Sequence, residues 1–183
     1  MNAFFNMFGS NTPAEPQPQE PKPVLDENFI KTGEVVINGF KLHSKLTIQD
    51  FCRQNDLKVK DGRFASYTYL QKIELYGEVF NVCASFRDGK LDQITLYPRI
   101  SELLPDDYET GAKIGVQISK SVAREWLIKQ LGKPHEDEEE MTCYRYNWGG
   151  VGTMYTGPNW RDGLYSGGDI CIGYRENYLG EQL

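Results

Sequence analysis

The chain has 183 residues, of which 39% are hydrophobic and 13% aromatic, so it is long and apolar enough to bury its own core. Its formal net charge of −6, with no block of Lys or Arg, argues against a nucleic-acid-binding surface. No stretch approaches the roughly 20 consecutive apolar residues that a membrane-spanning helix requires. These properties predict a folded, acidic protein with a cytoplasmic location.

The first 23 residues are predicted to form a tail outside the folded domain of residues 24–183. Residues 11–23 contain five prolines and no large apolar side chain, a composition that favours an extended, solvated linker. Residues 1–9 carry three phenylalanines but lack the basic start and the cleavage site of a signal peptide. We expect this segment to dock on the protein or to act as a weak anchor, in which case the chain is a tethered scaffold.

Residues 24–104 are predicted to form a first α/β unit. Asn38-Gly39 is a strong signal for a hairpin turn, here between strands at 33–37 and 40–43. Thr47 follows at the position of a helix N-cap. Asp50, three residues later, completes a variant of the capping box for a helix ending near residue 55.

A three-stranded meander is predicted next. Alternating residues from 67 to 75 lead to a turn at Tyr76-Gly77, and strands at 79–86 and 91–97 flank Asp88-Gly89. A two-residue turn at this position places Phe86 opposite Leu91 and Val82 opposite Thr95.

Residues 105–183 are predicted to form the second unit. The alternation of Ile114, Val116 and Ile118 indicates a strand, and Ser119 or Ser121 is placed to cap a helix that runs to Leu131. Gly132 fits a left-handed helix end, and Pro134 prevents continuation. An exposed acidic loop at 135–140 then leads into a final antiparallel sheet at 141–175, which is rich in Gly and aromatic residues.

The two units share three short strings at nearly constant spacing. Leu46-Thr47 corresponds to Ile118-Ser119 and Tyr76-Gly77-Glu78-Val79 to Trp148-Gly149-Gly150-Val151, both 72 positions apart (47 to 119, 76 to 148). Phe86-Arg87-Asp88-Gly89 corresponds to Trp160-Arg161-Asp162-Gly163, 74 positions apart (86 to 160). We interpret this as a tandem duplication. The predicted fold is α+β, with two tandem helix-plus-meander units whose helices pack on one face of the sheet.

The helix–meander order, the string Phe86 to Leu91 and the helix exit Leu131-Gly132-Lys133-Pro134 resemble tandem-repeat modules of the β-lactamase-inhibitor-protein type. They also resemble the small outer-membrane lipoproteins that share this module, over about residues 30–176. The resemblance implies a binding module without a cofactor, which presents aromatic residues from the open face of its sheet to a protein partner. The sequence shows neither a signal peptide nor a lipobox, so the expected role is that of a bacterial immunity-type protein that neutralises a toxin, here a basic one.

Seven residues of the last sheet are the candidate partner interface, because Trp, Tyr and Arg dominate the binding energy of protein interfaces. They are Tyr144, Tyr146, Trp148, Tyr155, Trp160, Arg161 and Tyr165. Tyr144, Tyr146 and Trp148 alternate, so they share one face of a strand. They are core residues if a helix covers that face, and interface residues if it is open.

Catalytic and metal-binding patterns are weak. The cysteines form no CxxC pair and are predicted to be buried, reduced thiols. The only histidines, His43 and His135, do not occur in a recognisable nucleophile or zinc pattern, so we expect no metal and no cofactor. One enzymatic alternative remains, a hydrolase or carbohydrate-acting enzyme that uses Asp162, Asp169 and the aromatics around 144–169.

Overall fold

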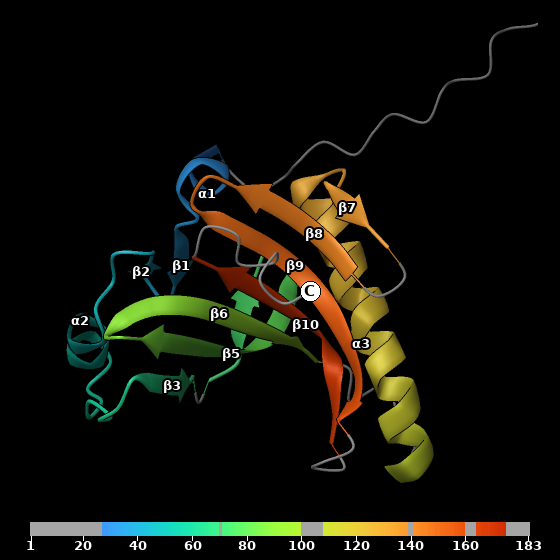
Figure 1. Ribbon diagram of the computed structural model, residues 1–183, viewed down its shortest axis with the longest axis horizontal. Helices are drawn as coiled ribbons and strands as arrows, with labels where there is room; N and C mark the ends of the chain where they lie inside the picture. Colours follow the sequence, from blue (N-terminus) through green and yellow to red (C-terminus); the bar gives the residue numbers. More distant parts are fainter. Residues whose placement is uncertain (1–26, 70, 100–107, 139–140, 160–163, 175–183) are drawn as a thin grey trace, which may run out of the picture.

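The computed structural model describes residues 27–69, 71–99, 108–138, 141–159 and 164–174. Within these ranges the protein has an α+β fold, in which one large antiparallel sheet curves beside a long helix (Figure 1). The predicted tail at 1–23 and the predicted boundary between the two units at 104–105 lie outside the described residues.

A small hairpin and two short helices make up the N-terminal part. Helix α1 (Glu27–Thr32) precedes strands β1 (Val35–Ile37) and β2 (Phe40–Leu42), which form a separate two-stranded sheet. The turn between them is the predicted one, because Asn38 and Gly39 both adopt positive φ, at 51° and 80°.

Helix α2 (Ile48–Gln54) begins at the predicted cap. The Thr47 hydroxyl oxygen accepts a hydrogen bond from the backbone N–H of Asp50, at 3.1 Å. The Asp50 carboxylate in turn accepts a hydrogen bond from this hydroxyl, at 2.7 Å, rather than from the backbone N–H of Thr47 that a capping box uses. The helix therefore has an N-cap, but the reciprocal contact is made between side chains.

The large sheet combines all the remaining strands. Its order is β3-β5-β6-β10-β9-β8-β7, with β4 paired to β5 beside β3. The strands are β3 (Phe64–Thr68), β4 (Ile73–Leu75), β5 (Glu78–Arg87), β6 (Lys90–Pro98), β7 (Glu136–Asp137), β8 (Met141–Tyr146), β9 (Gly149–Asn159) and β10 (Leu164–Gly173). The meanders of the two halves thus meet at the antiparallel β6–β10 pair, where Leu96 lies opposite Ile170.

The β5–β6 hairpin confirms half of the predicted register. Phe86 lies opposite Leu91, as the Asp88-Gly89 turn requires, but Val82 lies opposite Leu96 and not Thr95. The pairing shifts between Ser85 and Phe86, because β6 contains one extra residue there. Both Leu91 and Ile94 can therefore be buried, although three positions separate them.

The region after residue 107 differs most from the prediction. Residues predicted as a strand at 114–118 belong to α3 (Tyr108–Leu131), a single helix of 24 residues. Ser119 does not cap this helix: it lies inside it, and its hydroxyl donates to the carbonyl of Gly168 in β10, at 3.1 Å. Buried residues recur at helical spacing along the described part of α3, which accounts for the longer helix: Ser119, Ala123, Trp126, Leu127, Gln130 and Leu131.

The helix ends as predicted at Gly132, which has a φ of 77° and whose N–H donates to the carbonyl of Ile128. The predicted acidic loop is partly ordered as an edge strand. Glu136 and Asp137 form β7, and each pairs with an arginine: Arg145 and Arg124, respectively.

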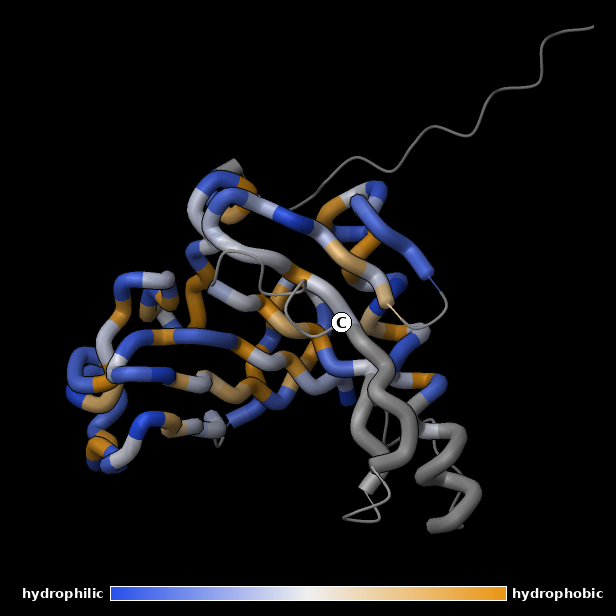
Figure 2. Tube along the Cα trace, viewed as in Figure 1, coloured by the Kyte–Doolittle hydropathy of each residue, from blue (hydrophilic) through white to orange (hydrophobic). Residues whose placement is uncertain are grey.

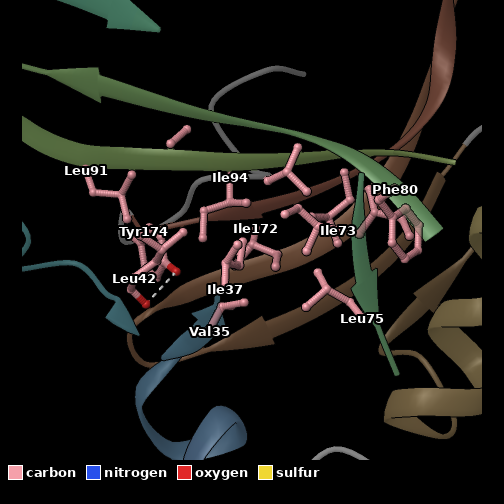
Figure 3. Close-up of a cluster of buried hydrophobic side chains, with 14 of the residues drawn as sticks. Val35, Ile37, Leu42, Ile73, Leu75, Phe80, Leu91, Ile94, Ile172 and Tyr174 are labelled. Carbon is pink, nitrogen blue, oxygen red and sulfur yellow. Dashed lines mark hydrogen bonds between the residues drawn. The ribbon is translucent and has the colours of Figure 1, made fainter. Parts of the chain in front are cut away.

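Both longer helices cover the same face of the sheet. From Phe80 onwards, buried residues of β5 alternate with exposed or half-buried ones. Along the chain as a whole, hydrophobic segments (orange) and hydrophilic segments (blue) follow one another at short intervals (Figure 2). Phe51 of α2 contacts Phe86 with ring centroids 5.1 Å apart, and Trp126 of α3 contacts Phe80 at 5.3 Å. The core is continuous between these ends, and β1, β2 and β4 close it (Figure 3).

Candidate functional site

Tyr144 of the predicted interface is a core residue. It is 1% exposed, and its hydroxyl donates a 2.7 Å hydrogen bond to the carbonyl of Gly132, at the end of α3. Burial raises the pKa of this phenol well above its usual range. Tyr144 therefore fastens the helix end to the sheet and offers no surface to a partner.

Trp148 also has a structural role. Its indole N–H donates to the carbonyl of Ile30 at 3.0 Å, and its ring contacts Phe29 at 5.6 Å and Tyr174 at 5.8 Å. The half-buried ring of Tyr146 stacks on it, at 5.1 Å and an interplanar angle of 12°. The pair therefore holds α1 against the end of the sheet, and only part of the Tyr146 ring reaches solvent.

Tyr174 completes this junction from the end of β10. Its buried hydroxyl contacts the carbonyls of Gly33 and Leu42, at 3.0 and 3.4 Å (Figure 3). Gly33 has a φ of 69°, and a Cβ there would lie 2.5 Å from the ring of Trp148. The aromatic cluster thus requires glycine at position 33.

The other four residues of the predicted interface lie wholly or partly outside the described part of the chain. Trp160, Arg161 and the candidate acid Asp162 lie outside the described residues, as do the side chains of Tyr155 and Tyr165. The backbone of Tyr155 lies in β9, and that of Tyr165 lies in β10. The structure consequently places the side chains of only three residues of the predicted interface, at positions 144, 146 and 148.

The sheet face opposite the helices carries a different set of residues, which we call the outer face. Cross-strand contacts define it, including the Ser66–Ser85 hydroxyl pair at 2.9 Å and the Gln93 amide, which donates to the sulfur of Cys171 at 3.2 Å. Its members are Phe64, Ser66, Thr68, Asn81, Cys83, Ser85, Arg87, Gln93, Thr95, Tyr97, Asp169 and Cys171.

Phe64 dominates one end of the outer face. Its ring is 61% exposed, on the edge strand β3, and the guanidinium groups of Arg87 and Arg63 lie 4.9 and 5.5 Å from its centre. Arg87 pairs with Asp92 at 3.6 Å, and Arg63 pairs with Asp88 at 3.3 Å. An exposed aromatic ring between two oriented cations is a surface feature without a packing role.

Asp169 and Tyr97 occupy the other end, about 20 Å away along β5 at roughly 3.3 Å per residue. They occupy neighbouring positions on β10 and β6, one step beyond the Ile170–Leu96 pair. Burial raises the pKa of the Asp169 carboxyl to about 6. Burial, and then the charge of Asp169, raise the pKa of the Tyr97 phenol, whose residue is 39% exposed.

Replacing Asp169 by asparagine is expected to stabilise the fold at neutral pH. The pKa of Asp169 in the folded protein lies above the ordinary value of 3.8, so the free energy of unfolding decreases as the pH rises from about 4 to about 6. At 1.4 kcal/mol per pKa unit, this shift corresponds to a loss of about 3 kcal/mol, which partial exposure of the carboxyl reduces to about 1–2 kcal/mol. Urea unfolding at pH 4.5 and 7.5 measures it.

The matched control for this substitution is Asp56→Asn, because Asp56 is exposed and its φ of 51° suits asparagine. We expect the control to leave the pH dependence unchanged. A gain in stability on Asp169→Asn that is equal at the two pH values would contradict the raised pKa.

Metal and thiol chemistry find little support in the described ranges. They contain no group of three or more His, Cys, Asp or Glu residues arranged to hold a metal ion. None of the four cysteines, all of which lie in the described ranges, forms a disulfide. Cys52 and Cys143 are buried, as predicted, and Cys83 and Cys171 are half-buried on the outer face. None of the helices in the described part of the chain combines the length and apolarity that a membrane crossing requires.

Sequence reasoning missed Phe64 although a signal was present. In Phe64-Ala65-Ser66-Tyr67-Thr68, strand alternation places Phe64 on the face opposite Tyr67. Tyr67 is buried, so a large apolar residue on the other face deserved a functional interpretation.

Comparison with known proteins found no matching family model, no similar curated protein and no similar solved structure.

Proposed function

We propose that this chain is a non-catalytic protein-binding module that acts through the outer face of its sheet. The observation that carries the proposal is the ring of Phe64, 61% exposed between two arginines. In its most concrete form, the protein is a bacterial immunity-type protein that neutralises a toxin in the cytoplasm.

The energetics of interfaces support this use of Phe64. Aromatic and arginine side chains contribute most to binding when they are buried by a partner. Ion pairs with Asp88 and Asp92 already restrain Arg63 and Arg87, so fewer rotamers are lost on binding. The position of Phe64 on a β-strand also fixes its direction.

A duplication of one helix-plus-meander unit is part of the proposal. The 74-residue offset between the two hairpin strings makes Leu96 equivalent to Ile170, and these residues lie directly opposite each other in the β6–β10 pair. When two copies of a unit are related by a two-fold axis, equivalent residues lie opposite each other at the point where the axis passes between the copies. The helices match less well, because α2 has 7 residues and α3 has 24.

Replacing Phe64 by serine is expected to weaken partner binding at least tenfold without loss of stability, because an exposed aromatic anchor contributes about 2 kcal/mol or more. The tagged full chain is used to capture partners from its native extract, and the affinity of one stoichiometric partner is then measured by calorimetry. Val36→Ser is the matched control, because Val36 is 50% exposed on β1, away from the outer face.

Retention of the partner by Phe64→Ser with unchanged affinity would refute the proposed surface. Loss of the partner with both Phe64→Ser and Val36→Ser would equally refute it, because the effect would not be specific to the outer face.

The hydrolase alternative rests on one observation. A carboxyl with a pKa of about 6 is suited to donate a proton near neutral pH, and Asp169 meets this condition. Glycoside hydrolysis needs a second carboxylate, and burial alone accounts for the shift at Asp169, without a contribution from a neighbouring acid. Turnover of a glycoside panel that is abolished by Asp169→Asn would support the enzyme over the binding module.

A further inference from the structure

Asp169 differs from every other half-buried carboxylate of the described residues in its surroundings. Each of the others lies within 3.6 Å of a cationic side chain: Glu34 with Lys41, Asp50 with Arg53, Asp92 with Arg87 and Glu136 with Arg145. For Asp169 the described part of the chain supplies no such cation. Within the described residues, the partly desolvated negative charge of Asp169 thus has no cationic partner, which is unfavourable.

The side-chain amide of Gln93, a neutral donor on the outer face, is already engaged. The Gln93 side-chain amide donates to the hydroxyl of Thr95 at 2.8 Å and to the sulfur of Cys171 at 3.2 Å. These two bonds use both of its N–H groups. The amide is therefore held toward the centre of the outer face, and it has no donor left for the Asp169 carboxylate.

We propose that Asp169 and Tyr97 form a receptor for a lysine or arginine side chain of the protein partner. The inference rests on the proposed function and specifies the chemistry of its partner. The carboxylate supplies a charged acceptor, and the exposed ring of Tyr97 beside it supplies a face for a cation. A cation that binds there compensates the carboxylate, so the unfavourable charge of the free protein becomes favourable in the complex.

The charge distribution of the outer face favours a basic side chain over an acidic one at this end. At the Phe64 end, Asp88 and Asp92 already compensate the arginines. At the Tyr97 end, the Asp169 carboxylate forms no ion pair with a described residue, in a protein whose formal net charge is −6. Electrostatic complementarity of this kind sets the orientation and the choice of the partner.

The receptor is expected to respond to pH through Asp169. The charge of Asp169 acts on Tyr97 of β6, whose phenol is also influenced by Cys83 of β5 and Cys171 of β10. Burial is the cause of the raised pKa of Asp169 itself. On the other side of the sheet, α3 meets Gly168 through its backbone at Ser119 and Lys120. Only the ionised carboxylate attracts a cation, so binding is expected to weaken below pH 6.

The test uses three blocked pentapeptides with glycine on both sides of a central lysine, arginine or norleucine. Norleucine has an unbranched alkyl chain like that of lysine but carries no charge. Each peptide is titrated into the ¹⁵N-labelled full chain at pH 7.5 and pH 5.0, and the amide shifts of residues 96, 97 and 168–171 are followed. The same titrations are made with Asp169→Asn and with the charge-matched control Asp56→Asn.

We expect the lysine and arginine peptides to shift these amides saturably at pH 7.5, and about tenfold more weakly at pH 5.0, where about a tenth of Asp169 is ionised. Asp169→Asn abolishes the effect, and Asp56→Asn preserves it. The proposal is overturned if the norleucine peptide binds equally well, if Asp169→Asn binds the lysine peptide as the unmodified chain does, or if no peptide shifts these amides.

The two proposals can fail separately. If the peptides do not bind but Phe64→Ser still loses a stoichiometric partner, the cation receptor is wrong and the binding surface stands. If the cationic peptides bind but Phe64→Ser retains its partner, the receptor stands and the assignment of the Phe64 surface is wrong.

Discussion

Replacing Gly149 by alanine is expected to destabilise the protein by about 3–4 kcal/mol, because steric overlap and backbone strain add at this position. Gly149 opens β9 with a φ of 146°, and a Cβ there would lie 1.9 Å from the carbonyl oxygen of Gly173. That oxygen belongs to the neighbouring strand, where Gly173 pairs with Gly150, so it cannot move aside without breaking the β9–β10 ladder. The free energy of unfolding, measured in urea by circular dichroism, tests this expectation.

Gly77→Ala is the matched control for this experiment. Gly77 also has a positive φ, 84°, but a Cβ there would meet no atom within 4 Å. The control is therefore expected to cost only about 1 kcal/mol, from backbone strain alone. Equal losses for Gly149→Ala and Gly77→Ala would show that the close approach of β9 and β10 does not determine the requirement for glycine.

Replacing Trp148 by alanine is expected to cost about 2–4 kcal/mol in stability, because this half-buried residue joins α1 to the sheet. The substitution removes ring contacts with Phe29 and Tyr174 and leaves the carbonyl of Ile30 without its indole donor. Thermal unfolding and amide hydrogen exchange of residues 27–37 measure the effect. We expect exchange in this segment to accelerate more than in β5 and β6.

Tyr146→Ala provides the comparison. Tyr146 stacks on Trp148, but among the described residues its hydroxyl makes no hydrogen bond to α1, so a smaller loss of stability is expected. If Trp148→Ala left stability unchanged and weakened partner binding instead, the result would contradict the structural role and support the prediction from the sequence that Trp148 is an interface residue.

These expectations divide the aromatic residues into two groups with different roles. Tyr144, Trp148 and Tyr174 hold elements together on the helix-covered side, whereas Phe64 and Tyr97 remain exposed on the outer face. The predicted idea that aromatics project from an open sheet face is kept in the proposal. In the proposal Phe64 and Tyr97 carry it, whereas Tyr144 and Trp148 make junctions with the end of α3 and with α1.

Features that depend on local chemistry follow from the amino-acid sequence alone. Asn38-Gly39 and Asp88-Gly89 specify tight turns because these residues tolerate positive φ, and the structure has both. Thr47 and Gly132 mark helix ends for equally local reasons. The side-chain oxygen of Thr47 accepts a hydrogen bond from an otherwise unpaired backbone N–H, and Gly132 adopts a left-handed conformation that the absence of a Cβ permits.

Features that depend on residues distant in sequence follow from the tertiary structure. An extra residue in β6 shifts the register of its pairing with β5. Buried residues at helical spacing pack α3 on β10 and account for the helix in a segment whose alternation predicted a strand. Trp148 reaches Ile30 across 118 positions, which no local pattern encodes. Asp169 acquires its raised pKa from burial, a property of the folded sheet and not of its neighbours in sequence. Turns and caps form from adjacent residues, whereas the choice between core and surface follows from which strands meet.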